Sequence, residues 1–286
     1  MRILLSNDDG ILAPGLAALH WAIADMGDVS VVAPDSPQSA AGHSITLTHP
    51  LAVRKVKVEA LGSFTGISVD GRPADCVRLA IRSLLPQRPD LVVAGINAGS
   101  NVGINVLYSG TVAAATEGAM LGVPAVAFSA SMKGGEVDFA RIGELCRGVL
   151  DGLLAMGLGE ADLVNVNIPT LVDGQCKGIR VVRQSTSGIE DIYQCEVVNG
   201  LEQYQIGKEY GFLPCDPDTD VVAVADGYIT VTPLQIDRTD HSKMARLAET
   251  FGKIADCGLP ATPKPLCGEG GRIADFKSQD GGDTVE

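Results

Sequence analysis

Short runs of apolar residues alternate along the chain with longer segments in which apolar residues recur every three or four positions. Five runs have the composition of buried strands: Arg2–Ser6, Val29–Ala33, Leu91–Ile96, Ala125–Ser129 and Leu163–Ile168. Four segments have the helical period: Gly15–Met26, Ala74–Leu85, Thr111–Leu121 and Val137–Leu154. Alternating strands and helices are typical of βαβ units, so we predict an α/β fold with a mostly parallel sheet covered by helices.

The pattern differs in three other stretches. Polar and apolar residues alternate between Leu51 and Val69, which predicts a hairpin. After Gly178 we expect an extended, hairpin-rich insertion without helices, whose short strands are Ile179–Val182, Tyr204–Ile206, Val221–Val224 and Tyr228–Pro233. A last helix is expected over His241–Ile254, with Asp240 as its N-cap. We therefore predict one domain over residues 1–254 and a flexible Pro/Gly-rich tail over residues 255–286.

The overall composition excludes several classes of protein. Hydrophobic residues make up 45% of the 286 positions, which is typical of a globular chain with a sizeable core. The net charge of −13 argues against binding to a nucleic-acid polymer, because such proteins need clustered Lys and Arg. The seven cysteines are widely spaced and form no C-x-x-C pair, so neither a disulfide framework nor a zinc site is expected. The first residues do not resemble a signal peptide, and we expect a cytoplasmic protein.

The segment from Leu91 to Thr116 contains no charged residue, but it is not expected to span a membrane. Asn97, Asn101 and Asn105 would each bring an amide into hydrocarbon, where nothing satisfies it. No membrane partner is therefore predicted.

The strongest chemical signal is the pair of carboxylates directly after the first strand. Gly10 allows the chain to turn there, so Asp8 and Asp9 can converge at the carboxyl end of the strand, where open α/β sheets bind ligands. Two close carboxylates repel each other unless a cation or a proton lies between them. A divalent ion is one explanation, and ordinary turn or cap chemistry of Asp is the alternative.

The next two strand ends supply further oxygen ligands. The loop after the second strand contains Ser39 and His43, and a lone loop histidine is more often a solvated surface residue than a catalytic one. The third strand ends in a Gly-Asn loop that carries Asn97 and Asn101. Carboxylates, a hydroxyl and an amide oxygen suit magnesium or manganese better than zinc.

A phosphate site is suggested by Ser109, Gly110 and Thr111, which precede an Ala-rich helical segment. Small residues at a helix start present free backbone N–H groups to an anion. A plain Ser/Thr helix cap is the alternative. Since Leu91–Thr116 holds no Lys or Arg, the backbone amides and hydroxyls of this turn would have to provide the donors.

Together these motifs resemble the SurE (survival protein E) family of metal-dependent nucleoside monophosphate phosphatases. The similarity covers about residues 1–254 and rests on six blocks: Arg2–Gly10, Val32–Asp35 with Ser39, Arg72–Val77, Gly95–Gly103, Tyr108–Ala115 and Gly227–Leu234. The resemblance implies a Rossmann-like three-layer α/β/α sandwich. It also implies that the C-terminal hairpin and helix, within about residues 178–254, are exchanged between subunits of a homodimer or homotetramer.

The resemblance also implies roles for individual residues. One divalent ion per subunit, magnesium or manganese, would be held by Asp8, Asp9, Ser39 and Asn97. Asn101, Ser109, Gly110 and Thr111 match positions that border the phosphate pocket. In one respect the chain departs from the family: it reads Gln38-Ser39-Ala40 where the family usually has Ser-Gly, and the Cβ of Ala40 restricts that loop.

Three functional hypotheses follow. The first is a phosphatase that hydrolyses nucleoside 5′-monophosphates, with 3′-monophosphates as further substrates, and in which Asp8 or Asp9 is the general base and His43 an outside candidate. The second is a non-enzymatic nucleotide-binding module on the same fold. The third is a phosphatase of short polyphosphates or sugar phosphates, which the metal ligands alone do not distinguish from the first.

Overall fold

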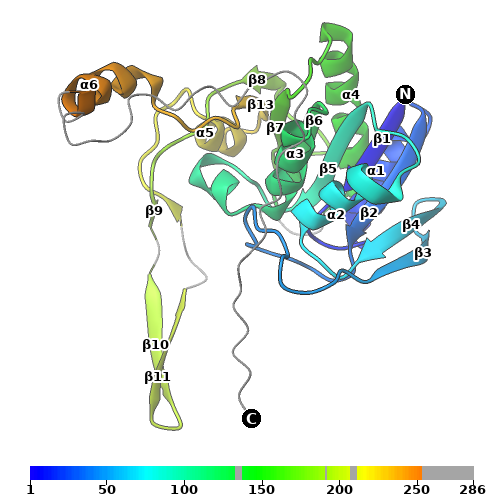
Figure 1. Cartoon of the computed structure of the whole chain (residues 1–286), viewed down its shortest axis with the longest axis horizontal. Coiled ribbons are helices and arrows are strands. Elements are labelled where there is room, and N and C mark those ends of the chain that lie inside the picture. Colours follow the sequence, from blue (N-terminus) through cyan, green and yellow to red (C-terminus); the bar gives the residue numbers. More distant parts are fainter. Residues whose placement is uncertain (133–136, 191, 207–210, 253–286) are drawn as a thin grey trace. The chain divides into compact units, whose positions relative to one another are not determined.

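The computed structural model describes residues 1–132, 137–190, 192–206 and 211–252 (Figure 1). The chain divides into two units, Met1–Ile236 and the residues from Asp237 onward. The first unit contains the sheet and all the strand ends discussed above. The second unit is represented by one described helix.

A nine-stranded sheet forms the centre of the first unit, in the order β3-β4-β2-β1-β5-β6-β7-β13-β8. Strands β1, β2, β5, β6 and β7 pair in parallel, β3 and β4 form the antiparallel hairpin expected between Leu51 and Val69, and β13 is antiparallel to β7. The bounds are β1 (Arg2–Ser6), β2 (Asp28–Pro34), β3 (Val53–Glu59), β4 (Ser63–Val69), β5 (Leu91–Ala98), β6 (Ala125–Ala130), β7 (Leu163–Ile168), β8 (Ile179–Val181) and β13 (Ile229–Leu234). The prediction of a mostly parallel sheet is confirmed.

Helices cover both faces of this sheet. The helices are α1 (Pro14–Ile23), α4 (Phe139–Met156), α2 (Pro73–Leu79), the π-helical turn η1 (Ala80–Leu84) and α3 (Gly110–Met120). Ile3 and Leu5 belong to one core cluster with residues of α1 and α4, while Leu4 belongs to another with residues of α2 and α3. Because successive strand residues face opposite sides, β1 is buried on both faces, as the central strand of a three-layer α/β/α sandwich must be.

The helix bounds differ from expectation in the segment before β5. A single helix was expected over Ala74–Leu85, but α2 ends at Leu79 and continues as η1. A π-helical turn has i→i+5 hydrogen bonds, and five residues are too few for their apolar pattern to distinguish it from an α-helical turn.

The insertion after β8 contains two short strand pairs and one helix that the sequence prediction missed. Strands β9 (Ile189–Glu190) and β12 (Gly211–Phe212) pair with each other, as do β10 (Tyr193–Val198) and β11 (Leu201–Ile206). The prediction of a strand over Val221–Val224 is wrong, because these residues belong to helix α5 (Asp220–Ala225). The expectation of an insertion without helices is therefore wrong as well. A four-residue apolar run does not distinguish a strand from a buried helical turn by periodicity.

The second unit contains α6 (His241–Gly252), which starts where expected because Asp240 accepts a hydrogen bond from the Ser242 backbone N–H at 3.1 Å. The rest of the expected helix and the tail over residues 255–286 lie outside the described residues. In the part of the chain that the structure describes, no helix is long and apolar enough to cross a membrane. The single domain over residues 1–254 stays a prediction.

Candidate active site

The predicted site residues lie where β1, β2 and β5 end. Strand β1 pairs with β2 on one side and with β5 on the other. The sheet continues from β2 through β4 on the first side and from β5 through β6 on the second, so the strand order changes direction at β1. Such a switch point opens a crevice at the carboxyl ends of the strands. Asp8 and Asp9 follow β1, Ser39 follows β2, and Asn97 lies at the end of β5.

Asp8 is the buried centre of the site. It is only 6% exposed, and its carboxylate accepts a hydrogen bond from the hydroxyl of Thr111 at the start of α3. Its backbone carbonyl accepts a hydrogen bond from the Gln38 N–H at 2.8 Å. Asp8 therefore joins the end of β1 to the loop after β2 and to the start of α3.

Gly110 allows α3 to approach this closely. A Cβ atom at this position would lie 2.7 Å from the Asp8 Cβ and 2.9 Å from its Oδ2. It would also lie 3.1 Å from the Pro73 Cγ, at the start of α2. Contacts this short do not occur between real Cβ atoms and their neighbours, so glycine is required here by space.

Burial raises the pKa of Asp8 to about 6. The hydrogen bond from Thr111 opposes this rise, and the negative charge of Asp9 adds to it. An ionised Asp8 is thus held in a place where it lacks a compensating charge. A divalent cation beside it would favour the ionised form.

Asp9 and Asn97 lie on the β5 side of the crevice. The Asp9 carboxylate accepts a hydrogen bond from the Ala98 backbone N–H at 3.0 Å. The Asn97 side-chain N–H donates to the Gly99 carbonyl at 2.6 Å. The oxygen of the same amide is then the atom that could bind a cation. Both side chains are therefore fixed by the end of β5, and both offer oxygen atoms.

Ser39 lies on a more exposed loop. The loop is attached to the site at two places, by the Gln38 N–H on Asp8 and by the Gly42 N–H on the Tyr108 carbonyl at 2.9 Å. Ser39 itself is exposed, and Ala40 adopts a positive φ of 54°. A residue with a Cβ is strained in this region, so the departure noticed at Ala40 has a physical cost.

The donor set fits a hard divalent cation. No group of three or more His, Cys, Asp or Glu side chains suited to a metal occurs among the described residues, which limits a metal to mixed ligands. Asp8, Asp9, Asn97 and Ser39 would supply two carboxylates, one amide oxygen and one hydroxyl, all from adjacent strand ends. Oxygen ligands of this kind suit magnesium or manganese.

At the start of α3, the expected phosphate-binding residues have several roles. Ser109 is the N-cap, because its Oγ accepts the Val112 N–H at 3.1 Å, and the Thr111 hydroxyl is bound to Asp8. The cap interpretation therefore describes Ser109 correctly. Gly110 and Thr111 occupy the first turn, where backbone N–H groups have no acceptor within the helix. The Thr111 backbone N–H interacts with the Asp8 carboxylate, so the Gly110 amide remains the candidate donor to an anion.

Asn101 is held by polar residues on buried strands, which the sequence reasoning missed. Its Nδ2 donates to the Ser129 Oγ at 2.8 Å, and its carbonyl accepts from Asn165 and Asn167 at 2.8 and 3.1 Å. Asn165 and Asn167 share one face of β7, a strand whose residues are all buried. Amides repeated at a two-residue spacing in an otherwise apolar strand were the available signal.

Asp220 was also missed. It is completely buried, and its carboxylate accepts backbone N–H groups of Gly103, Ser185 and Val221, each at 2.9 Å. Gly103 ends the Gly-Asn loop, whereas Ser185 and Val221 belong to the insertion after β8. Asp220 therefore couples the insertion to the loop that carries Asn97 and Asn101.

His43 makes its hydrogen bond away from the two aspartates. Its Nε2 lies 2.9 Å from the Oε2 of Glu117, a residue of α3 that is 1% exposed and also pairs with Arg78 at 2.8 Å. His43 thus connects the Ser39 loop to α3, which is more than the solvated surface role expected of a lone loop histidine.

Known proteins are similar to this chain in sequence. The family model described as "Survival protein SurE" matches residues 3–191. A protein of Desulfitobacterium hafniense named "5′-nucleotidase SurE" is 42% identical over 258 residues, which cover 88% of this chain and 97% of that protein. A protein of Thermus thermophilus named "5′-nucleotidase SurE 1" is 42% identical over 261 residues, covering 89% of this chain and all of that protein.

A solved structure gives the same result. The crystal structure of the SurE protein of Aquifex aeolicus has a TM-score of 0.74 and 39% identity, over 87% of this chain and 99% of that chain. The resemblance noticed in the motifs thus extends through the fold and nearly the whole length of the relatives. The chain belongs to the SurE family.

Proposed function

We propose that this enzyme is a metal-dependent phosphatase that hydrolyses nucleoside 5′-monophosphates, and also 3′-monophosphates, to nucleoside and phosphate. The single observation that carries the proposal is the packing of Asp8, the first residue of the carboxylate pair, against Gly110 and Thr111 in the first turn of α3. A carboxylate suited to a cation thus lies beside a helix N-terminus suited to an anion, and a phosphate ester with its metal requires both. The names of the relatives, 5′-nucleotidases, support the nucleoside monophosphate as substrate.

Different residues have different proposed roles in the reaction. Asp8, Asp9, Ser39 and Asn97 would hold one magnesium or manganese ion, which when bound supplies Lewis-acid chemistry and lowers the pKa of water. Asn101, Ser109, Gly110 and Thr111 would border the phosphoryl group, and the Gly110 amide would stabilise its developing charge. The ionised carboxylate of Asp8 or Asp9 accepts the proton of the attacking water.

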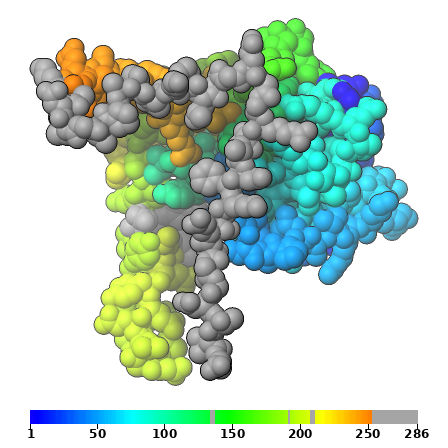
Figure 2. Space-filling view, viewed as in Figure 1, coloured from blue at the N-terminus to red at the C-terminus, as the bar shows by residue number. Residues whose placement is uncertain are grey.

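We also propose a homodimer or homotetramer in which the β10–β11 hairpin and the C-terminal helix are exchanged between subunits. Every residue of β10 and β11 is exposed (Figure 2, yellow-green), including apolar side chains. Val197 is 70% exposed and Leu201 68%, which is unfavourable for a hairpin in water. Light scattering on the full chain distinguishes this assembly from a monomer.

The five described cysteines are all free, and we propose a cytoplasmic location in which thiols stay reduced.

The test of the activity is phosphate release from nucleoside 5′- and 3′-monophosphates, pyrophosphate, short polyphosphates and sugar phosphates, with magnesium, manganese or a chelator. We expect metal-dependent release that is highest on nucleoside monophosphates. Asp9→Asn should abolish it, and Asp28→Asn, an exposed aspartate at the opposite end of β2, should not.

Other results would favour other functions. Highest release from polyphosphates or sugar phosphates would overturn the nucleotidase proposal in favour of another phosphatase. No release with any metal, from folded and metal-loaded protein that binds nucleotides, would indicate a binding module.

A further inference from the structure

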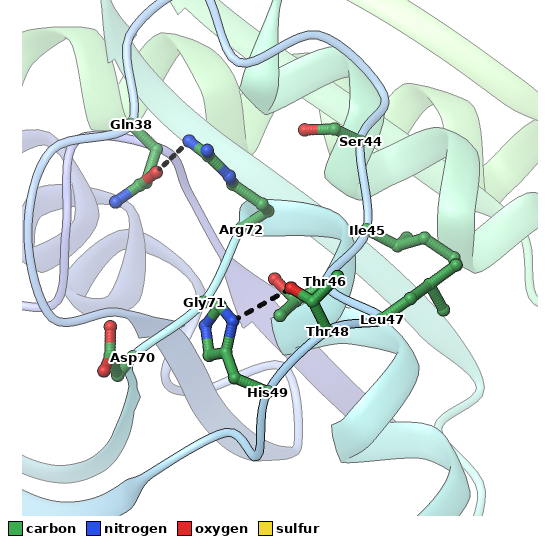
Figure 3. A pocket seen from close by; sticks show the side chains of 10 residues that line it. All are labelled: Gln38, Ser44, Ile45, Thr46, Leu47, Thr48, His49, Asp70, Gly71 and Arg72. Atoms are coloured by element: carbon green, nitrogen blue, oxygen red, sulfur yellow. Dashed lines mark hydrogen bonds between the residues drawn. The ribbon is translucent and has the colours of Figure 1, made fainter. Parts of the chain in front are cut away.

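A second hollow lies beside the Ser39 loop. It has a volume of about 600 Å³ and lies between Gln38, the segment 44–49 and the turn Asp70–Arg72 that follows β4 (Figure 3). Pockets for small molecules in proteins have volumes of about 300–1,000 Å³. The roles assigned above to the strand-end residues do not use this pocket.

One buried carboxylate joins the two walls of this pocket. Asp75 is 4% exposed and accepts hydrogen bonds from the Thr46 N–H at 2.9 Å, the Thr46 hydroxyl at 2.7 Å and the Arg72 N–H at 2.9 Å. Thr46 belongs to one wall and Arg72 to the other. The pocket is therefore built into the fold by charge-assisted hydrogen bonds, and its shape exists before a ligand arrives.

The pocket adjoins the proposed phosphate site at both walls. On one side, the Gln38 backbone N–H binds the Asp8 carbonyl at 2.8 Å, and the next residue is Ser39. On the other side, Arg72 precedes Pro73, whose Cγ lies 3.1 Å from the position of a Cβ on Gly110. The Arg72 Nη1 closes this side by donating to the Gln38 Oε1 at 2.7 Å (Figure 3). A ligand whose phosphate lies at Asp8 and Gly110 would extend into this pocket.

The chemistry of the lining suits a nucleoside. Arg72 offers a planar guanidinium, which stacks on aromatic rings and donates in fixed directions. The hydroxyl of Thr48 and the carboxylate of Asp70 can bind sugar hydroxyls and base edges. Leu47, 84% exposed, adds apolar surface. Aromatic residues make up only 4% of the chain, so a guanidinium plane is a natural stacking partner for a base.

We propose that this pocket is the nucleoside subsite, with the base against Arg72 and the sugar between the two walls. This inference rests on the proposed nucleotidase function and specifies which part of the protein recognises the nucleoside. Arg72 is then a specificity-determining residue that acts on the leaving group, separate from the residues that hold the phosphate.

The test compares substrates with and without a base. Wild-type protein, Arg72→Ala and Leu47→Ala are assayed with adenosine, guanosine, cytidine and uridine 5′-monophosphates and with ribose 5-phosphate. Loss of a base-stacking partner predicts a fall of about tenfold in the ratio of kcat/KM for a nucleotide to kcat/KM for ribose 5-phosphate in Arg72→Ala, mainly through KM. Leu47→Ala should show a smaller fall in the same direction.

Arg54→Ala is the matched control, because Arg54 is an exposed arginine on β3 outside the pocket lining, and the ratio should stay unchanged. Arg72→Lys keeps the positive charge and removes the planar guanidinium group. If stacking matters, its kcat/KM ratio should fall as far as that of Arg72→Ala. An equal fall on all five substrates would overturn the proposal, since it would show a disturbed Ser39 loop. An unchanged ratio would overturn it as well.

Failure of the activity itself gives a different result. If wild-type protein releases no phosphate from any substrate, the nucleotidase proposal fails, and calorimetry with adenosine 5′-monophosphate and magnesium still tests the pocket. Binding weakened by Arg72→Ala and unaffected by Arg54→Ala would support the subsite. Binding equal in all three proteins, or none in the wild type, would overturn it.

Discussion

The two walls of the candidate active site are built differently. One wall is made of Asp8, Gly110 and Thr111, which are buried residues directly after β1 and in the first turn of α3, packed in direct contact. The other wall is the loop of Ser39 and Ala40, two exposed residues whose neighbours attach it by backbone and side-chain hydrogen bonds. Both walls contribute to the same proposed metal and phosphate site.

The difference indicates a division of tasks. Groups that must be placed within a fraction of an ångström of the reacting phosphate are best carried by strands and helices. A loop tolerates changes more readily and is where recognition of different ligands varies. We therefore expect substitutions in the buried wall to affect catalysis strongly and substitutions in the exposed wall to have smaller effects.

Among substitutions that leave the proposed metal ligands in place, the largest effect is expected for Gly110→Ala. The new Cβ would lie 2.7 Å from the Asp8 Cβ, so either α3 or Asp8 must move. We expect activity to fall about 100-fold, since a displacement of this size misplaces reacting groups, with about 1–3 kcal/mol of lost stability. Steady-state kinetics and thermal unfolding measure both quantities.

The control for this substitution is Gly148→Ala in α4, where a Cβ would meet nothing within 4 Å. It should keep full activity and raise helix stability by about 0.5–1 kcal/mol. Equal activity in the two variants would contradict the close packing of the buried wall.

The next effect in size is expected for Thr111→Val, which keeps the shape and removes the hydroxyl that binds Asp8. A buried carboxylate that loses a donor costs about 1–3 kcal/mol, and we expect a lower melting temperature and a reduced kcat. Thr111→Ser keeps the hydroxyl and should stay close to the wild type. If Thr111→Val stayed close to the wild type and Thr111→Ser were impaired, then packing of the methyl group, and not the hydrogen bond, would hold Asp8.

Asp220→Asn tests whether the Gly-Asn loop is as sensitive to substitution as the buried wall of the site. The amide replaces one acceptor oxygen by a donor that would face backbone N–H groups, so we expect a loss of about 1–3 kcal/mol in unfolding free energy. Since Gly103 would shift, KM for the phosphate ester should rise as well. Asp218→Asn, an exposed aspartate near Asp220 in the sequence that pairs with Arg183, is the control and should change neither value.

The smallest effect is expected for Ala40→Gly in the exposed wall. Relief of the positive φ should outweigh the extra freedom of glycine in the unfolded chain, so stability should rise by at most about 1 kcal/mol. Ala41→Gly gains no such relief and should lower stability by about 0.4–1 kcal/mol. Chemical denaturation measures both, and a destabilised Ala40→Gly would contradict the strain assigned to Ala40.

Sequence alone predicted the parallel strands of the sheet, which the structure confirms, and named the residues with evident chemistry, whose roles stay predictions. The strands β1, β2, β5, β6 and β7 are rich in apolar residues, because strands covered on both faces bury most of their side chains. Asp8 and Asp9 were recognisable because two adjacent carboxylates at a strand end are costly without a partner. The Gly-Asn loop and the start of α3 were found for the same local reason.

Long-range contacts, in contrast, were decided only by the tertiary structure. Asn165, Asn167 and Asp220 lie more than 60 residues along the sequence from the loop to which they are hydrogen-bonded. No local sequence pattern predicts which residues they bind. The apolar run Val221–Val224 forms part of a helix. In so short a run, the surrounding residues, and not its own periodicity, determine whether the backbone N–H and C=O groups form helical or strand hydrogen bonds.

The sequence by itself therefore determined the layers of this protein and the identity of its chemical groups, since burial and charge repulsion act on residues close in the chain. The tertiary structure decided which residues hold those groups in place and where the pocket beside Arg72 opens. These features depend on hydrogen bonds and packing between segments that only folding brings together.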